Sequence, residues 1–256
     1  MWHSDSSKDN TLKDKIQECE LFPHTSAPWQ QDILNNFLRL VPQKNDSVCL
    51  DAAGGVGNNI ENLQKFFRKV VLLDRSSDAM DFAKERFEYV DPDILTFKQG
   101  HLEQIDVEDN YFDCVVCTEA LEHVQDHTVV LRELYRVIKK DGYLILSFQN
   151  HFNFSAIIKF VFERLTGKNW DAWGTHGHLG GYESYLTCFQ VKKTLKNVGF
   201  TSVVELGADY INAWLSWLPF LHRNYRILDK YPLLFLGKLP LIKYLGMDYF
   251  LILKKI

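Results

Sequence analysis

Five short apolar runs alternate with stretches of helical spacing between residues 48 and 148. The runs cover about residues 48–50, 70–73, 94–98, 112–117 and 143–148. Apolar runs that alternate with amphipathic helices are typical of parallel strands joined by crossover helices. The pattern predicts an α/β fold with a doubly wound, mostly parallel sheet.

The rhythm changes on either side of this region. Before it, apolar residues at helical spacing around Phe37 stop at Pro42, so residues 1–46 are predicted to form an N-terminal helical segment. After it, two insertions interrupt the alternation, an aromatic and His-rich one at about 151–185 and an apolar one at about 208–246. Further strands are predicted at 201–206 and 248–253. We expect residues 47–256 to form one domain in which the two insertions are helical lids.

Composition and charge exclude several classes of protein. The 256 residues are 46% apolar, which is enough for a large core. A net charge of −4 argues against nucleic acid as a partner. The polar first residues lack the apolar core of a signal peptide. The longest uncharged apolar stretch of the C-terminal part, residues 210–221, is shorter than the ~20 residues of a membrane span, so no span is expected.

Cysteine usage points to the cytoplasm. The chain has five cysteines, an odd number that does not suit a disulfide framework. Cys114 and Cys117 form a CxxC, but a strand over 112–117 would direct their side chains to opposite faces. Zinc binding and redox chemistry are therefore not predicted there, and we expect a reducing, cytoplasmic location.

The first apolar run ends in Asp51, and the sequence then breaks into a Gly-rich turn, GGVG. In an open parallel sheet, ligands bind at the carboxyl ends of the strands, where the first strand-to-helix turn presents backbone N–H groups. Glycines also serve any tight turn, so the turn alone leaves both interpretations open. The second run ends in Asp74, where a carboxylate can accept hydrogen bonds from a ribose diol. The two acids together favour a nucleoside cofactor.

The spacing within the turn separates the possible cofactors. A dinucleotide turn requires GxGxxG, but here Ile60 stands at the position of the third Gly. The phosphate-loop pattern GxxxxGK[ST] is absent from the sequence. An acid followed by a Gly-x-Gly turn suits a nucleoside without phosphates, because the turn then has no anion to neutralise.

Four segments in this order carry a family resemblance: LDAAGGVG, VVLLDRS, YFDCVVCTEALEHV and LRELYRVIKKDGYLILSFQN. Together they resemble class I S-adenosylmethionine-dependent methyltransferases, in particular the type 11 branch. The resemblance covers residues 47–150 and extends more loosely over 178–200. It implies a Rossmann-like sheet of about seven strands, the last of them antiparallel, and S-adenosylmethionine as the cofactor.

The resemblance also implies a set of cofactor-binding residues at the strand ends: Asp51, Ala53, Gly54, Gly55, Asp74, Arg75, His101, Leu102 and Thr118. Two of them depart from the family. The family's first motif is D-x-G-x-G-x-G, and Ala53 replaces its first Gly, which is tolerable if φ is negative there. The family often has an acid that contacts adenine after the third strand. His101 stands there, so that contact is expected from His101 or from the backbone of Leu102.

Glu119, Glu122 and His123 form an ExxEH motif after the fourth run. If this segment is helical, the three side chains lie on one face and could hold a divalent cation such as magnesium. Ubiquinone-pathway O-methyltransferases and small-RNA 2′-O-methyltransferases are similar here and use the motif for metal. Many other relatives look alike at this helix with no metal known, so a cap and packing motif is the alternative. A metal would be expected to take a further ligand from His176 or His178.

Histidines and aromatic residues gather in the insertions. His151, His176 and His178 are candidate general bases, because an unperturbed imidazole titrates near neutral pH. The alternative is that they bond loop backbone. The aromatic residues are predicted to form the lid core and to enclose an apolar acceptor pocket that excludes water: Trp170, Trp173, Tyr182, Tyr185, Tyr210, Trp214, Trp217 and Phe220.

These features predict an enzyme that transfers a methyl group from S-adenosylmethionine to an oxygen or nitrogen atom of a small, partly apolar or aromatic acceptor. One alternative is a non-catalytic nucleoside-binding protein on the same fold, because Ala53 and His101 depart from the family. The other is an NAD-dependent oxidoreductase, against which the missing third Gly counts. The identity of the acceptor and the oligomeric state do not follow from the sequence.

Overall fold

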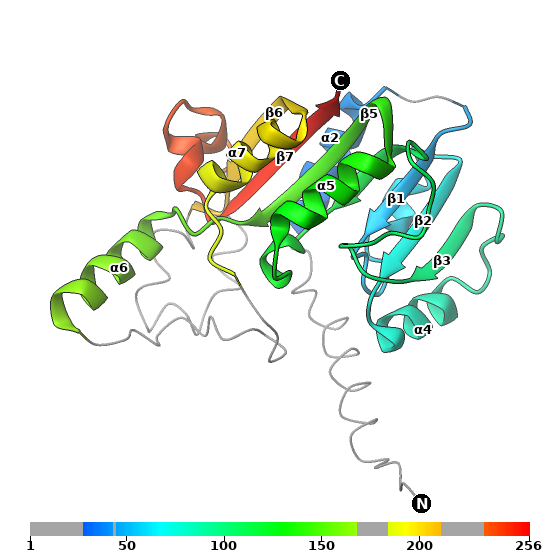
Figure 1. The fold of residues 1–256 in the computed structure, drawn as a ribbon, viewed down its shortest axis with the longest axis horizontal. Coiled ribbons are helices and arrows are strands. Elements are labelled where there is room, and N and C mark those ends of the chain that lie inside the picture. The colour runs from blue at the N-terminus through cyan, green and yellow to red at the C-terminus, as the bar shows by residue number, and fades with distance from the viewer. Residues whose placement is uncertain (1–27, 43–44, 168–183, 211–232) are drawn as a thin grey trace, which may run out of the picture.

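The computed structural model describes residues 28–42, 45–167, 184–210 and 233–256. Within these ranges the central element is a seven-stranded sheet with the order β3-β2-β1-β4-β5-β7-β6 (Figure 1). The strands are β1 (Val48–Ala52), β2 (Lys69–Asp74), β3 (Leu95–Gln99), β4 (Phe112–Cys117), β5 (Ile138–Gln149), β6 (Phe200–Ala208) and β7 (Asp248–Lys255). Neighbouring strands from β3 to β5 pair in parallel, whereas β7 is antiparallel to both β5 and β6. The predicted fold class, including the antiparallel last strand, is confirmed.

The register of the parallel strands places their carboxyl ends at one edge of the sheet. Asp51 in β1 is opposite Leu72 in β2 and Val116 in β4. Asp74, the last residue of β2, is opposite Gln99, the last residue of β3. Residues that follow these strands are therefore brought together in space although they lie far apart in the sequence.

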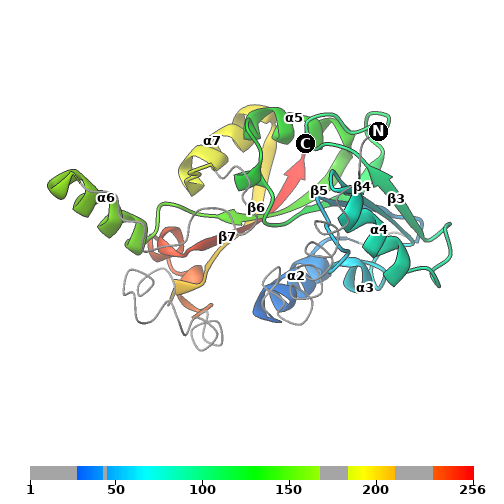
Figure 2. The same ribbon diagram turned by 90° about the horizontal axis from the view of Figure 1, so that it is seen from below.

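Helices cover both faces of the sheet (Figure 2). On one face lie α2 (Pro28–Leu40), α3 (Ile60–Leu63) and α4 (Ser77–Arg86), and on the other lie α5 (His127–Val137) and α7 (Cys188–Val198). Each face has its own apolar core, and each core includes side chains from β1, β2, β4, β5 and β7. Alternate residues of a strand point to opposite faces, so one apolar strand supplies both cores.

Helix α2 belongs to the core although it precedes the first strand. Ile33, Phe37 and Leu38 are buried against the sheet. The rings of Trp29 and Phe37 both meet the ring of Phe250 in β7 edge-on, with centroids 6.2 and 6.4 Å away. The described part of the N-terminal segment therefore packs as part of the same layered domain rather than as a separate helix.

Helix ends follow from local sequence. Ser76 caps α4 by accepting a hydrogen bond from the N–H of Ala79. Thr187 and Gln190 form a capping box at the start of α7, and Gly199 ends that helix with a left-handed φ of 119°. The apolar residues Ile60, Leu63, Phe66 and Phe67 have helical spacing, but helix α3 ends at Leu63 and does not include the two Phe residues.

The described parts of the two insertions are α6 (Phe154–Thr166) and the short 3₁₀ helices η3 (Leu236–Lys238) and η4 (Ile242–Leu245). Helix α6 extends away from the sheet in both views (Figures 1 and 2). Most of the aromatic residues predicted to enclose the acceptor lie outside the described residues, in 168–183 and 211–232. No helix in the described part of the chain has the length and apolar character that crossing a membrane requires.

The CxxC residues lie on opposite faces, as the strand prediction requires. Cys114 is buried in the core beneath α2 and Cys117 in the core beneath α5. Both are free thiols, as are Cys49 and Cys188 among the described residues.

Candidate functional site

The carboxyl ends of β1 and β2 form a network around Asp74. The N–H of Gly54 donates to the carbonyl of Leu73 at 3.1 Å, which ties the turn after β1 to β2. The N–H groups of Gly55 and Ser76 donate to the two carboxylate oxygens of Asp74 at 2.9 and 2.8 Å. A carboxylate accepts about four hydrogen bonds in all, so each oxygen of Asp74 retains capacity for a ligand hydroxyl group.

Asp51 lies beneath the same turn and is fully buried. Its Oδ1 accepts a hydrogen bond from the side chain of Asn59 at 3.0 Å, whereas its Oδ2 has no hydrogen-bond partner among the described residues. Burial raises the pKa of Asp51 to about 7, against the lowering effect of Asn59. A buried carboxylate oxygen without a donor costs about 1–3 kcal/mol, so this atom is suited to a donor supplied by a ligand.

The turn itself is built so that backbone faces the ligand side. A Cβ on Gly54 would lie 2.6 Å from Oδ2 of Asp51, so a side chain at Gly54 would collide with the buried acid. A Cβ on Gly55 would meet nothing within 4 Å, and Gly55 has a left-handed φ of 54°. Because glycine adopts such a φ without strain, the chain can present a bare N–H here.

Ala53 does not meet the condition under which it was expected to be harmless. Its φ is +59°, in the left-handed region, and not negative. An L-residue with a Cβ in this conformation carries strain of about 1–2 kcal/mol. The turn therefore keeps the backbone that a glycine would adopt, and Ala53 accommodates it at a cost in stability.

The remaining residues predicted to bind the cofactor lie near this network. Thr118 follows β4, and its Oγ1 accepts a hydrogen bond from the side chain of Asn59 at 3.3 Å. His101 and Arg75 are exposed after β3 and β2, whereas the side chain of Leu102 is buried in the core. Only the backbone of Leu102 is thus placed for a contact, while the side chain of His101 is accessible. These assignments remain predictions.

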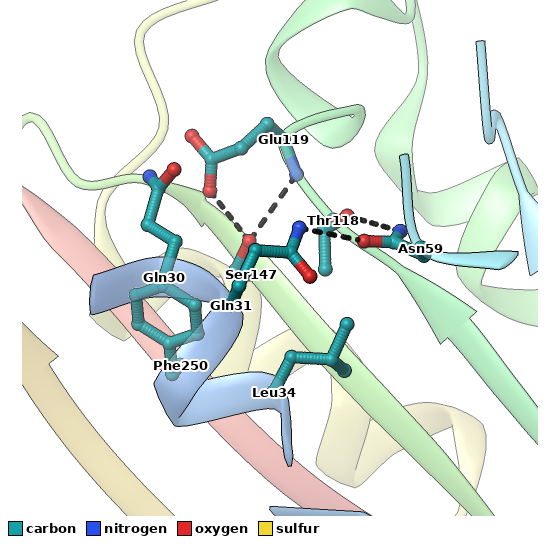
Figure 3. Close-up of a pocket in the computed structure, with 8 residues that line it drawn as sticks. All are labelled: Gln30, Gln31, Leu34, Asn59, Thr118, Glu119, Ser147 and Phe250. Atoms are coloured by element: carbon teal, nitrogen blue, oxygen red, sulfur yellow. Dashed lines mark hydrogen bonds between the residues drawn. The ribbon is translucent and has the colours of Figure 1, made fainter. Parts of the chain in front are cut away.

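A pocket lies between the N-terminal part of α2 and the ends of β4 and β5 (Figure 3). Its cavity volume is about 20 Å³, enough for one group the size of a water molecule. The lining combines amide, hydroxyl, carboxylate and apolar side chains: Gln30, Gln31, Leu34, Asn59, Thr118, Glu119, Ser147 and Phe250. Asn59 and Thr118 belong both to this pocket and to the network below the Gly turn, so the two are continuous.

Glu119 is the carboxylate of this pocket. Its Oε1 accepts a hydrogen bond of 2.5 Å from the hydroxyl group of Ser147, and its backbone N–H donates to the carbonyl of Ser147 at 3.2 Å. Burial raises the pKa of Glu119, against the lowering effect of Ser147. Asp248 lies behind the pocket, where it accepts a hydrogen bond from Gln30, and burial followed by the charge of Glu119 raises its pKa as well.

The ExxEH segment is not the α-helix that its spacing suggested. Glu119 has a left-handed φ of 51°, and only Leu121–His123 form a single 3₁₀ turn, η1. As a result Glu122 is buried, His123 is exposed and Glu119 points into the pocket. The predicted shared face is therefore wrong. The described residues contain no group of three His, Cys, Asp or Glu side chains arranged to hold a metal ion.

Of the candidate bases, only His151 lies in the described residues. The backbone N–H of His151 donates to the carbonyl of Leu186 at 2.7 Å, and the ring atom Nδ1 lies 3.3 Å from the same oxygen. The imidazole ring contacts the ring of Tyr185 edge-on. These contacts correspond to the alternative of bonding loop backbone. His176 and His178 lie outside the described residues.

Sequence reasoning missed the residues that join α2 to the strand ends. Gln31 donates to Asn59 at 3.1 Å, and Asn59 in turn donates to both Asp51 and Thr118. Asn59 could have been found, because it directly follows the Gly turn at the N-cap of α3. No sequence pattern marks the other residues of the pocket, Gln30, Gln31, Ser147 and Phe250. They come together only because α2 packs across the ends of the strands.

Comparison with known proteins supports one family. Residues 50–146 match the family described as a methyltransferase domain. The ubiquinone/menaquinone biosynthesis C-methyltransferase UbiE of Zymomonas mobilis is 30% identical over 114 residues, which are 44% of this chain and 46% of that protein. The chain thus matches about half the length of this curated relative.

Solved structures extend the likeness over most of the chain. An S-adenosylmethionine-dependent methyltransferase of Mesorhizobium loti has a TM-score of 0.57 at 14% identity, covering 86% of this chain and 96% of that one. A chain from the complex between the Haloferax volcanii Trm112 methyltransferase activator and a methyltransferase has a TM-score of 0.63 at 15% identity, covering 98% and 97%. Likeness at such identities establishes the fold. With the match of residues 50–146, it confirms the resemblance to class I S-adenosylmethionine-dependent methyltransferases.

Proposed function

We propose that this chain, with the fold and the central domain of class I S-adenosylmethionine-dependent methyltransferases, transfers a methyl group to a small acceptor. The acceptor atom is an oxygen or a nitrogen, and the acceptor has an apolar or aromatic part. The observation that carries the proposal is the buried Oδ2 of Asp51 without a donor, directly below a turn whose glycines expose backbone. This arrangement fits a ligand that brings hydrogen-bond donors to the end of β1.

The residues at the strand ends fit S-adenosylmethionine in kind. Asp74 would hold the ribose hydroxyl groups, because both its oxygens face N–H donors from Gly55 and Ser76 and still have capacity. Asp51 and the backbone of Gly54 and Gly55 would hold the amino-acid part. When bound, the cofactor supplies an electrophilic methyl group on a positively charged sulfur.

The chain's own contribution is positioning and exclusion of water. Leu34 and Phe250 supply an apolar wall to the pocket, and Thr118 and Asn59 link the pocket to the turn after β1. An acceptor held in this pocket would lie next to the cofactor residues. Holding two reactants in a fixed orientation contributes a large part of the acceleration in such reactions.

The finer parts of the proposal rest on separate observations. A net charge of −4 supports a small acceptor rather than nucleic acid. The buried free cysteines support a reducing, cytoplasmic location. Of the open alternatives, the non-catalytic binding protein has one observation in its favour, the strained φ of Ala53 in the first motif. For the NAD-dependent oxidoreductase, Ile60 remains an obstacle, because it is fully buried where a dinucleotide turn requires Gly.

Calorimetric titration tests the donor site directly. We expect S-adenosylhomocysteine to bind and NAD not to bind. Asp74→Ala should weaken binding by about 1–3 kcal/mol, the loss of hydrogen bonds to a charged group. Asp78→Ala, a change to an exposed acid on the neighbouring helix α4, should leave the affinity unchanged. Equal affinity in the Asp74 variant and the wild type would remove Asp74 from the site. Binding without turnover on any acceptor would favour the non-catalytic alternative.

A further inference from the structure

The pocket of Figure 3 offers a ligand mainly hydrogen-bond acceptors. Its amide side chains already donate to protein oxygens, Gln30 to Asp248, Gln31 to Asn59, and Asn59 to Asp51 and Thr118. One oxygen of Glu119 is bonded by Ser147, and the other forms no hydrogen bond among the described residues. A group that enters this pocket is therefore best matched if it donates.

The acids around the pocket have no basic partner among the described residues. None of the lining residues is Lys, Arg or His. Besides Glu119 in the lining, Asp248 lies behind Gln30 and Asp51 lies behind Asn59, both of them buried. None of these three acids forms an ion pair with Lys or Arg among the described residues. Burial raises the pKa of all three carboxyl groups, and a cation bound beside them would stabilise their charged forms.

The apolar wall is compatible with such a cation. The ring of Phe250 and the side chain of Leu34 line the same space as Glu119. An aromatic face attracts an ammonium group, and more strongly where water is excluded. The cavity volume of about 20 Å³ admits one group the size of a water molecule, which is also the size of an ammonium group, so the rest of such a ligand would extend out of the pocket.

We infer that this pocket binds an ammonium group, with the free oxygen of Glu119 as its counter-ion, and that the acceptor is therefore a primary or secondary amine. An ammonium nitrogen has no lone pair, so Glu119 would take its proton before the nitrogen attacks the methyl group. That the bound amine is the methyl acceptor rests on the proposed function. That the pocket binds an amine does not depend on it. A neutral alcohol would donate one hydrogen bond but would not stabilise the ionised form of Glu119. A carboxylate would meet further acids and no basic side chain in the lining.

Three probes of similar size and different charge test the inference in the wild-type protein. Benzylamine, benzyl alcohol and benzoate are titrated by calorimetry into protein saturated with S-adenosylhomocysteine. We expect benzylamine to bind at least tenfold more tightly than benzyl alcohol, because a hydrogen bond between charged groups replaces a neutral one. Benzoate should bind most weakly. Equal affinity for the amine and the alcohol would overturn the inference, and this comparison requires no variant to fold.

A pair of variants identifies the counter-ion. Glu119→Gln keeps the size of the side chain and should reduce the preference for benzylamine over benzyl alcohol to less than threefold. Glu108→Gln makes the same change at an exposed residue away from the pocket and should keep the full preference. A preference that survives Glu119→Gln would overturn the role of Glu119.

The same titrations separate the two proposals. Wild-type protein that binds S-adenosylhomocysteine but shows no preference for the amine would overturn the amine pocket and leave the donor site standing. Protein that binds benzylamine tightly, but not S-adenosylhomocysteine, would overturn the proposed function and support the amine pocket.

Discussion

Two residues of the candidate site, Ala53 and Glu119, adopt left-handed backbone conformations, with φ of 59° and 51°. Such conformations cost free energy in residues with a Cβ and persist where the surrounding structure imposes them. For Ala53 the imposing contacts are the hydrogen bonds that tie the following Gly54 and Gly55 to Leu73 and Asp74. For Glu119 they are the hydrogen bonds to the backbone and hydroxyl group of Ser147. Both strained residues directly adjoin groups to which we assign ligands.

Replacing Ala53 by Gly should relieve this strain. The left-handed conformation costs an L-residue about 1–2 kcal/mol, and the greater freedom of Gly in the unfolded chain offsets about 0.4–1 kcal/mol of the gain. We therefore expect Ala53→Gly to raise the free energy of unfolding by about 0.5–1 kcal/mol in urea titrations. Ala79→Gly, the same change within helix α4, should lower it. A destabilised Ala53→Gly protein would show that the methyl group of Ala53 contributes packing that outweighs the strain.

The buried Asp51 should make stability depend on pH. Its pKa is raised from 3.8 to about 7, so between these values the folded protein binds a proton that the unfolded chain has lost. The free energy of unfolding therefore falls as pH rises through this window. Asp51→Asn cannot ionise, so without ligand it should be more stable than the wild type at about pH 8, by up to about 4 kcal/mol, and similar at about pH 4.

Other groups contribute to the same slope, so the comparison of the two proteins is the informative quantity. Burial also raises the pKa of Glu119 and Asp248, and their contribution has the same sign. We expect Asp51→Asn to make the pH dependence in urea titrations shallower without abolishing it. Identical slopes in the two proteins would mean that water or a relaxed structure solvates Asp51 in solution.

At the scale of elements, the strands were predictable because their cause is local. Each parallel strand contains an apolar run, and the observed β4, Phe112–Cys117, has the predicted bounds. Strand β5 begins at Ile138, before its predicted run at 143–148, because it includes polar residues that the apolar pattern does not mark. The shared edge of Asp51 and Asp74 follows from the topology of such a sheet. What was not predictable depends on tertiary contact. Ser147 holds Glu119 in a left-handed conformation from a neighbouring strand, and this contact turns a helical spacing into η1.

Helix α2 illustrates the same limit for the candidate site. Its apolar spacing predicts a helix, but nothing in the spacing shows that the helix lies across the sheet with Gln30 and Gln31 at the pocket. The structure shows both roles at once, because one side of α2 buries Phe37 and Ile33 while its first turns supply polar lining. Packing of this helix and the shape of the pocket are therefore coupled.

Two substitutions on α2 measure how far the sheet depends on it. Phe37 is 5% exposed and packs on Phe250, so Phe37→Ala should lower the free energy of unfolding by about 3–5 kcal/mol. Leu40, on the same helix, is 60% exposed, and Leu40→Ala should cost less than about 0.5 kcal/mol. Chemical denaturation monitored by fluorescence provides both values. Similar small losses at the two positions would mean that α2 detaches from the sheet in solution.

At the scale of the whole molecule, the predicted donor residues occupy one half of the sheet, but the apolar cores extend across both halves. The donor residues follow β1, β2, β3 and β4, whereas β7 and β6 lie at the other edge. On each face a continuous apolar core extends from β2 to β7. The long antiparallel pairings of β7 with β5 and β6 bind that edge to the rest. A sheet held together in this way is expected to unfold as one unit.

Binding at one edge should therefore stabilise the entire sheet. S-adenosylhomocysteine at about 100 times its Kd adds about 2.7 kcal/mol to the free energy of unfolding of a two-state protein. Amides of β7 and β6 lie far from the donor residues in strand order, yet those that exchange only through global unfolding should slow by about a hundredfold, as should those of β1 and β4. Hydrogen exchange followed by mass spectrometry, with and without the ligand, measures both halves in one experiment. Protection gained by β1 to β4 alone would show that the β7 edge opens independently of the strands that hold the donor residues.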